Sequence, residues 1–92
     1  MNKKEYILKL LTALDGKWSM AAGLKLLIEH NVLNDQTIVG LQHIFAESIK
    51  QVNDQKAQEY LLKSQTFLQK LQAVELQEQS KEDDLNKLLA DI

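Results

Sequence analysis

The chain of 92 residues contains no cysteine, no proline and no arginine. Without cysteine it can form no disulfide, no thiolate metal site and no cysteine nucleophile. Without arginine it lacks the bidentate donor that usually recognises phosphate, guanine and desolvated carboxylates. Proline, the strongest helix breaker, is absent, and only three glycines are present. The composition therefore favours helix along the whole chain.

Aromatic residues make up only 5% of the chain, so aliphatic side chains must supply most of the core. No stretch approaches the roughly 18 consecutive apolar residues that a membrane span requires. Residues 1–20 also lack the apolar run and the small-residue cleavage site of a secretory signal. These absences predict a soluble cytoplasmic protein that makes no membrane contact.

The charge is small in total but unevenly distributed along the chain. Residues 1–74 carry nine lysines and seven acidic residues, a net charge of +2, whereas residues 75–92 carry two lysines and six acidic residues, a net charge of −4. A nearly neutral body is therefore followed by an acidic C-terminal helical segment, residues 80–92.

Apolar residues recur at spacings of three and four along most of the sequence, which predicts an all-α fold. The expected helices are about 3–15, 18–30, 35–52, 54–79 and 81–91, with 54–79 the longest. Together they predict a single helical domain over residues 1–92, a small bundle of four to five helices. Segment 18–30 is apolar on so many sides that it is expected at the centre of this bundle.

The apolar pattern of segment 54–79 continues beyond a charged gap. Its apolar residues recur at alternating spacings of three and four residues as far as Val74. The next two positions at these spacings are the charged residues Glu78 and Lys81. The three positions after those are apolar: Leu85, Leu88 and Ile92. One unbroken helix over residues 54–91 would have 38 residues and a length of about 57 Å. The shorter helices could not cover it, so its far end would need a second chain.

A break near Gln79-Ser80 is the favoured alternative. Ser80 is a good N-cap, and the acidic residues 82–84 would lie where the positive end of a new helix attracts carboxylates. Segment 81–91 would then fold back and lay three leucines on the bundle: Leu85, Leu88 and Leu89.

No catalytic, cofactor-binding or metal-binding residue is predicted. His30 and His43 are the only histidines, and their spacing matches no metal motif. The acidic run 82–84 lacks the alternating oxygen ligands and turn glycine of a calcium loop. No glycine-rich phosphate loop or serine elbow is present. The sequence therefore predicts a protein that is not an enzyme.

Gly23 and Gly40 fall inside expected helices, where each glycine is less favourable than alanine by roughly 1 kcal/mol. The simpler interpretation is a close crossing of helices, which the small residues Ala21 and Ala22 beside Gly23 support. The alternative is a groove in which a ligand approaches the backbone.

Segments 18–30 and 35–52, joined by a short turn, could form a helix-turn-helix. The charge of segment 35–52 contradicts a helix-turn-helix. This segment has one lysine, Lys50, and two acidic residues, Asp35 and Glu47, so it lacks the net positive charge that supplies most DNA affinity. A small basic end remains on the first helix, formed by Lys3, Lys4 and Lys9. A weak nucleic-acid-binding regulator that uses these lysines is therefore the alternative function.

The leading hypothesis is a small non-enzymatic protein-interaction module: an adaptor, assembly subunit or inhibitor. Leu62 and Leu76 fall on the nominally polar side of segment 54–79, where they could contact a partner or be covered by another helix. The partner is expected to be another protein or a second copy, bound through the long helix and the C-terminal segment. The candidate partner-contact residues are Leu62, Leu76, Leu85, Leu88 and Ile92.

Overall fold

The structure is a computed structural model that describes residues 2–30, 33–73 and 79–92 of the chain. These residues form five helices and no strand. The helices are α1 (Lys3–Leu14), α2 (Ala21–Glu29), α3 (Asp35–Gln51), α4 (Gln55–Ala73) and α5 (Gln79–Ala90). The all-α prediction is confirmed, and α4, with 19 residues, is the longest helix among them.

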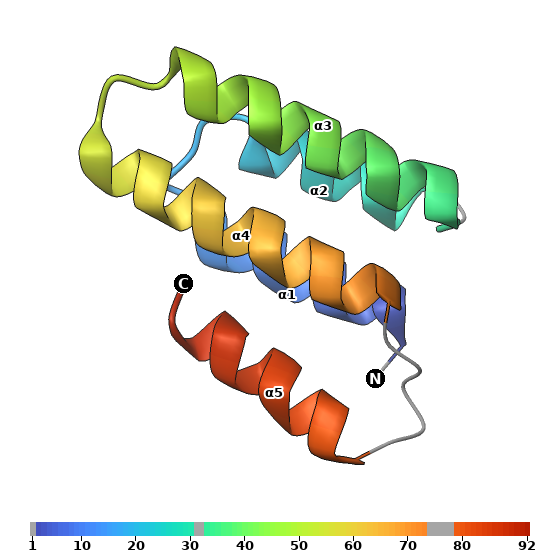
Figure 1. The fold of residues 1–92 in the computed structure, drawn as a ribbon. Helices are drawn as coiled ribbons and strands as arrows, with labels where there is room; N and C mark the ends of the chain where they lie inside the picture. The colour runs from blue at the N-terminus through green and yellow to red at the C-terminus, as the bar shows by residue number, and fades with distance from the viewer. Residues whose placement is uncertain (1, 31–32, 74–78) are drawn as a thin grey trace.

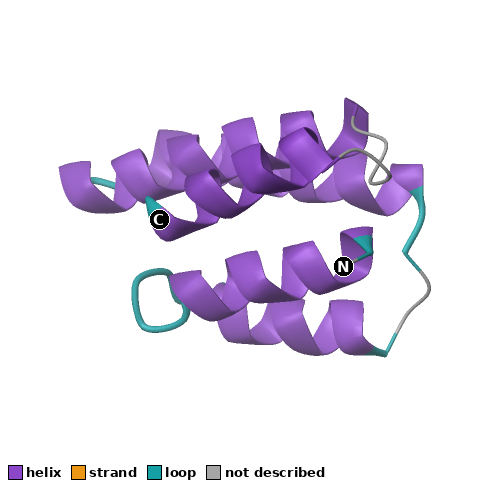
Figure 2. Ribbon diagram, turned by 90° about the horizontal axis from the view of Figure 1, so that it is seen from below, coloured by secondary structure: helices purple, strands orange, loops and turns teal. Residues whose placement is uncertain are grey.

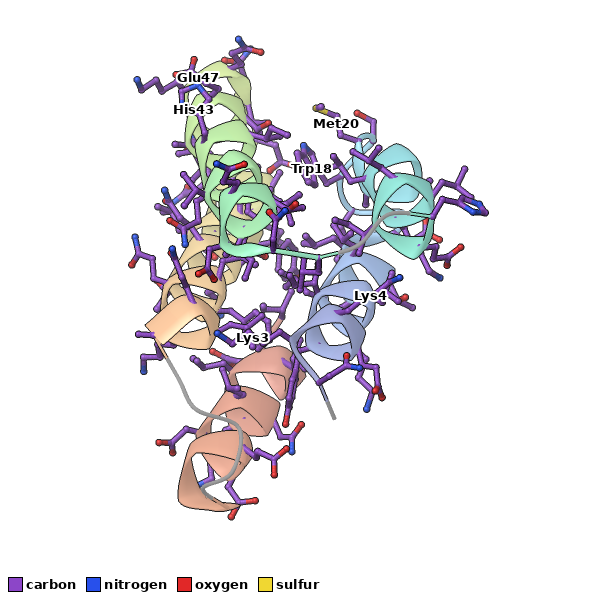
Figure 3. The ribbon with its side chains drawn as sticks, turned by 90° about the vertical axis from the view of Figure 1, so that its right-hand side faces the viewer. Lys3, Lys4, Trp18, Met20, His43 and Glu47 are labelled. Carbon is purple, nitrogen blue, oxygen red and sulfur yellow. The ribbon has the colours of Figure 1, made fainter. Side chains whose placement is uncertain are left out.

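The helices are arranged as two hairpins and a fifth helix. α1 packs on α2, and α3 packs on α4, so the two hairpins form two layers (Figure 2). α4 also contacts α1, and α5 lies along both of them and covers the seam where the two hairpins meet (Figures 1 and 3). The core is therefore closed by α5 on one side of the molecule, opposite α2 and α3.

Local sequence signals explain where α1 and α3 begin. The Asn2 side chain accepts a hydrogen bond from the Glu5 backbone N–H at 2.8 Å, and the Glu5 carboxylate accepts from the Asn2 N–H at 3.5 Å. This reciprocal pair of bonds is a capping box, in which the N-cap residue and the residue three positions on satisfy each other's backbone donors. Asn34 caps α3 through its side chain alone, which accepts a hydrogen bond from the Thr37 N–H at 2.9 Å.

The core is built from aliphatic side chains around a few rings. The rings of Tyr6 and Phe67 lie 6.3 Å apart, where α1 meets α4. The rings of Trp18 and Phe45 lie 4.9 Å apart and join the α1–α2 connection to α3. All four side chains are buried, and both pairs are tilted, which is a favourable geometry for aromatic rings.

α4 and α5 are separate helices, so the predicted break is confirmed and the continuous helix over 54–91 is wrong. The position of the break was not predicted correctly. α4 ends at Ala73, and Gln79 and Ser80 already belong to α5. Residues 74–78 lie outside the described part of the chain. Leu71 is the last buried residue of α4 among those described.

α5 is fixed to the bundle by apolar side chains and by two lysines. Leu85 and Ile92 are buried in the common core. The Lys17 ammonium donates to the Ile92 carbonyl at 2.8 Å, and the Lys63 ammonium donates to the Asp91 carbonyl at 3.4 Å. Positive charge at the C-terminal end of a helix is stabilising, typically by about 0.3–1 kcal/mol. Both lysines therefore stabilise the C-terminal end of α5.

Tyr6 provides the contact at the other end of α5. Its hydroxyl donates to the Glu82 carboxylate at 3.4 Å. Burial raises the pKa of Tyr6 above its ordinary value of 10.0, and the neighbouring Glu82 carboxylate raises this pKa further. The folded chain therefore favours the neutral phenol more strongly than the unfolded chain does.

The raised pKa of Tyr6 predicts a loss of stability at alkaline pH. Because the folded pKa lies above the unfolded one, the stabilisation is complete below about pH 10 and is lost as pH rises through the folded pKa. At neutral pH the Tyr6→Phe variant should lose only the hydrogen bond, about 0.5–1.5 kcal/mol. Urea unfolding of both proteins between pH 7 and pH 11 should show this difference shrinking above pH 10. A difference that stays constant with pH would contradict the assigned environment of Tyr6.

The position expected for the second helix was wrong. α2 was expected at the centre of the bundle, but among the described helices only α1 has Cα atoms within 8 Å of those of α2, and α3 has none. It is also shorter than predicted, because residues 15–20 form a turn in which Gly16 has a φ of +83°. The most apolar helix of the protein therefore lies at an edge.

Candidate functional site

The edge position of α2 leaves large apolar side chains in contact with solvent. Leu26 is 58% exposed and Leu27 is 54% exposed, and Met20, directly before the helix, is 47% exposed. The charged residues of α2 are Lys25 and Glu29, four residues apart and therefore on one side of the helix. Most of the exposed circumference of α2 is consequently apolar and uncharged.

One side of this surface continues onto α3. The Ser48 hydroxyl lies 4.0 Å from the sulfur of Met20, and Figure 3 shows Met20 above Trp18 between the two helices. Ile44 lies one turn before Ser48, on the same side of α3, and packs against the edge of the core. Leu27 is seven residues beyond Met20, which places both on the same side of α2.

The two glycines inside helices lie at this surface rather than between packed helices. A Cβ atom added to Gly23 or Gly40 would meet no described atom within 4 Å beyond its own helix. Close crossing of helices within one chain, the simpler interpretation of these glycines, is therefore wrong. Both residues are exposed: Gly23 is four residues before Leu27, and Gly40 is four residues before Ile44.

The partner-contact residues predicted from the sequence are not brought together. Leu62 is 50% exposed on the outer side of α4. Leu85 and Ile92 are buried, and Leu88 is half-buried against the same core. Leu76 lies outside the described residues. The apolar side chains of the C-terminal segment are therefore used to hold α5 on α1 and α4.

The ionisable residues form no equipped reaction site in the described part of the chain. His30, the residue that follows α2, and His43 on α3 are both exposed, and His43 lies one turn before Glu47 (Figure 3). No group of three metal-ligating side chains was found among the described residues. Each buried side-chain nitrogen or oxygen atom there has a hydrogen-bond partner, as Ser64 has in the Tyr60 carbonyl at 2.7 Å.

A hollow of about 440 Å³ lies between the N-termini of α1 and α3, beside the basic end of α1. Its lysines are used within the chain. The Lys3 ammonium donates to the Gln72 carbonyl near the end of α4 at 3.2 Å, and the Lys4 ammonium donates to the Glu29 carbonyl at the end of α2 at 3.3 Å. These contacts assign both lysines a structural role at helix ends, and they give the nucleic-acid alternative no support.

Comparisons with known proteins found no matching family model, no matching curated sequence and no matching solved structure. None of the described helices is long and apolar enough to cross a membrane.

The sequence pattern does not predict the exposed surface of α2. The helical pattern makes residues 18–30 apolar on several sides, which predicts burial at the centre of the bundle. Two features of this segment indicate a short and weakly favoured helix, but neither reports its place in the bundle. No Ser, Thr, Asp or Asn lies at the N-cap, where Met20 makes no side-chain capping bond, and Gly23 lowers the helix propensity within only nine residues.

Proposed function

We propose that the protein is a small non-enzymatic interaction module that binds protein through the exposed surface of α2. The observation that carries the proposal is the gathering of half-exposed Met20, Leu26 and Leu27 on and beside one nine-residue helix. Single exposed leucines are ordinary, but contiguous apolar patches of a few hundred Å² on small proteins often mark binding sites. An adaptor, an assembly subunit or an inhibitor would all use such a surface.

The arrangement of the other helices supports this location. The C-terminal segment buries Leu85 and Ile92 within its own chain, so it is not the first surface that a partner would meet. Leu62 stands singly on the outer side of α4, and Val39 stands singly on α3. The proposal includes a cytoplasmic location.

The proposal is tested by capture from native extract with two variants of equal charge change. Leu26→Glu together with Leu27→Glu places two carboxylates on α2, whereas Leu62→Glu with Val39→Glu places two at separate exposed positions. Both should keep the helical circular dichroism of the wild type. A specific partner should be retained by the wild type and the second variant and lost by the first. If no protein, including a second copy of the chain, distinguishes the two variants, the proposal is wrong.

A further inference from the structure

The exposed surface described above extends across α2 and α3 as one face. We call it the α2–α3 face, and it comprises Met20, Gly23, Leu27, Gly40, Ile44 and Glu47. Residues 20, 23 and 27 follow the spacing of one side of α2, and residues 40, 44 and 47 follow the spacing of one side of α3. Figure 3 shows Met20 and Glu47 on the same side of the molecule, the side away from α5.

We propose that the α2–α3 face binds the same face of a second copy of this chain. The inference rests on the proposed function and names its partner. The two copies would be related by a two-fold axis that runs between α2 and α3, parallel to both helices. Such an axis lays α2 of one copy on α3 of the other, and it makes the contact isologous.

The register within one chain makes this face self-complementary. The contact of Ser48 with Met20 places these two residues at the same level of antiparallel helices. At about 1.5 Å per residue, Gly40 then lies within one residue's rise of the level of Leu27, and Ile44 lies within one residue's rise of the level of Gly23. Rotation about the two-fold axis leaves every residue at its level along the helices and brings α2 of one copy onto α3 of the other. A large side chain of one copy therefore meets a glycine of the other at both contacts.

Charge complementarity points in the same direction. By the same register Glu47 is level with the first turn of α2, and the N-terminus of α2 has no side-chain cap. A carboxylate is favourable at the positive N-terminal end of a helix. Glu47 of one copy would supply that carboxylate to α2 of the other, and it lies among exposed groups where its ion pair with Lys50, at 3.7 Å, is solvated.

The size of the face sets the strength that is expected. α2 has nine residues, so a face two helices wide along its length covers roughly 300 Å² per copy. Standard stable interfaces bury about 800 Å² per partner. The dimer should therefore be weak, with a dissociation constant on the order of 100 μM. The small net charge of −2 opposes association only weakly.

Sedimentation equilibrium of the full chain between about 10 μM and 1 mM tests the proposal, because this range brackets the expected dissociation constant. The wild type and the Leu62→Glu control should dimerise with the same constant. Leu27→Glu should remain monomeric, since it places a carboxylate within the contact. A wild type that is monomeric at 1 mM, or a dimer that Leu62→Glu disrupts and Leu27→Glu does not, overturns the proposal.

Gly40→Ala is a second test variant, because it should stabilise the folded chain and weaken the dimer at the same time. A residue with only a structural role would not produce this combination. Alanine in an exposed helix should shift the folding equilibrium toward the native state about fivefold. The added methyl group should at the same time weaken the dimer about tenfold or more, because it occupies the space in which Leu27 of the other copy packs. Stabilisation with unchanged dimerisation would overturn the proposal. A different protein captured through α2, with the chain itself monomeric, would overturn this inference and leave the proposed function standing.

Discussion

Replacement of Phe67 by alanine should lower the free energy of unfolding by about 3–5 kcal/mol. Phe67 is fully buried on α4, and its ring lies 6.3 Å from that of Tyr6 on α1. The variant would leave a cavity where the two hairpins meet and where α5 covers them. A domain of this size has a total stability of about 5–14 kcal/mol, so much of it would be lost.

Leu62→Ala is the matched control, because Leu62 lies on the same helix and is 50% exposed. Its effect should stay within about 0.5 kcal/mol. Urea unfolding followed by circular dichroism at a single protein concentration gives both values. Equal losses for Phe67→Ala and Leu62→Ala would mean that α4 faces the core with a different side.

Leu85→Ala should lower the free energy of unfolding by about 2–4 kcal/mol. Leu85 is a buried side chain of α5, the helix that covers α1 and α4. Because α5 lies on its own chain, the loss should be the same at 5 μM and at 500 μM protein, a span that should reveal any stabilisation by association.

Asn86→Ala is the control for Leu85→Ala, because Asn86 is the next residue of α5 and is exposed. It should change stability by less than about 0.5 kcal/mol. A loss for Leu85→Ala that appears only at high concentration would show that α5 packs on another chain instead.

The sequence predicted the elements of this fold better than it predicted their arrangement. The apolar side of α4 and the capping residues Asn2 and Asn34 are local signals, and the structure contains all of them. The separation of α4 from α5 was also predicted, because a charged gap interrupts the apolar series. The end of α4 was not, because it depends on how far the bundle covers the helix, which periodicity does not report.

The exposed apolar surface of α2 could not be predicted from the sequence. Apolar periodicity distinguishes buried sides from exposed sides only when a helix has both, and α2 has apolar residues on nearly every side. Its place at the edge depends on α5, which occupies the seam between α1 and α4. The role of Lys17 at the end of α5 is likewise a contact between residues distant in sequence, and no local pattern announces it.

Small-angle X-ray scattering of the dilute full chain, extrapolated to zero concentration, tests most directly whether residues 79–92 complete the core of their own chain. The folded-back α5 gives a Cα radius of gyration of 12.4 Å and a longest extent of 38 Å. The measured radius of gyration should lie close to this value, which is that of a compact domain of this length, and the maximum dimension should exceed the Cα extent only by the side chains and the hydration layer. A maximum dimension of about 57 Å or more, the length of a helix over residues 54–91, would contradict the fold and the argument built on it.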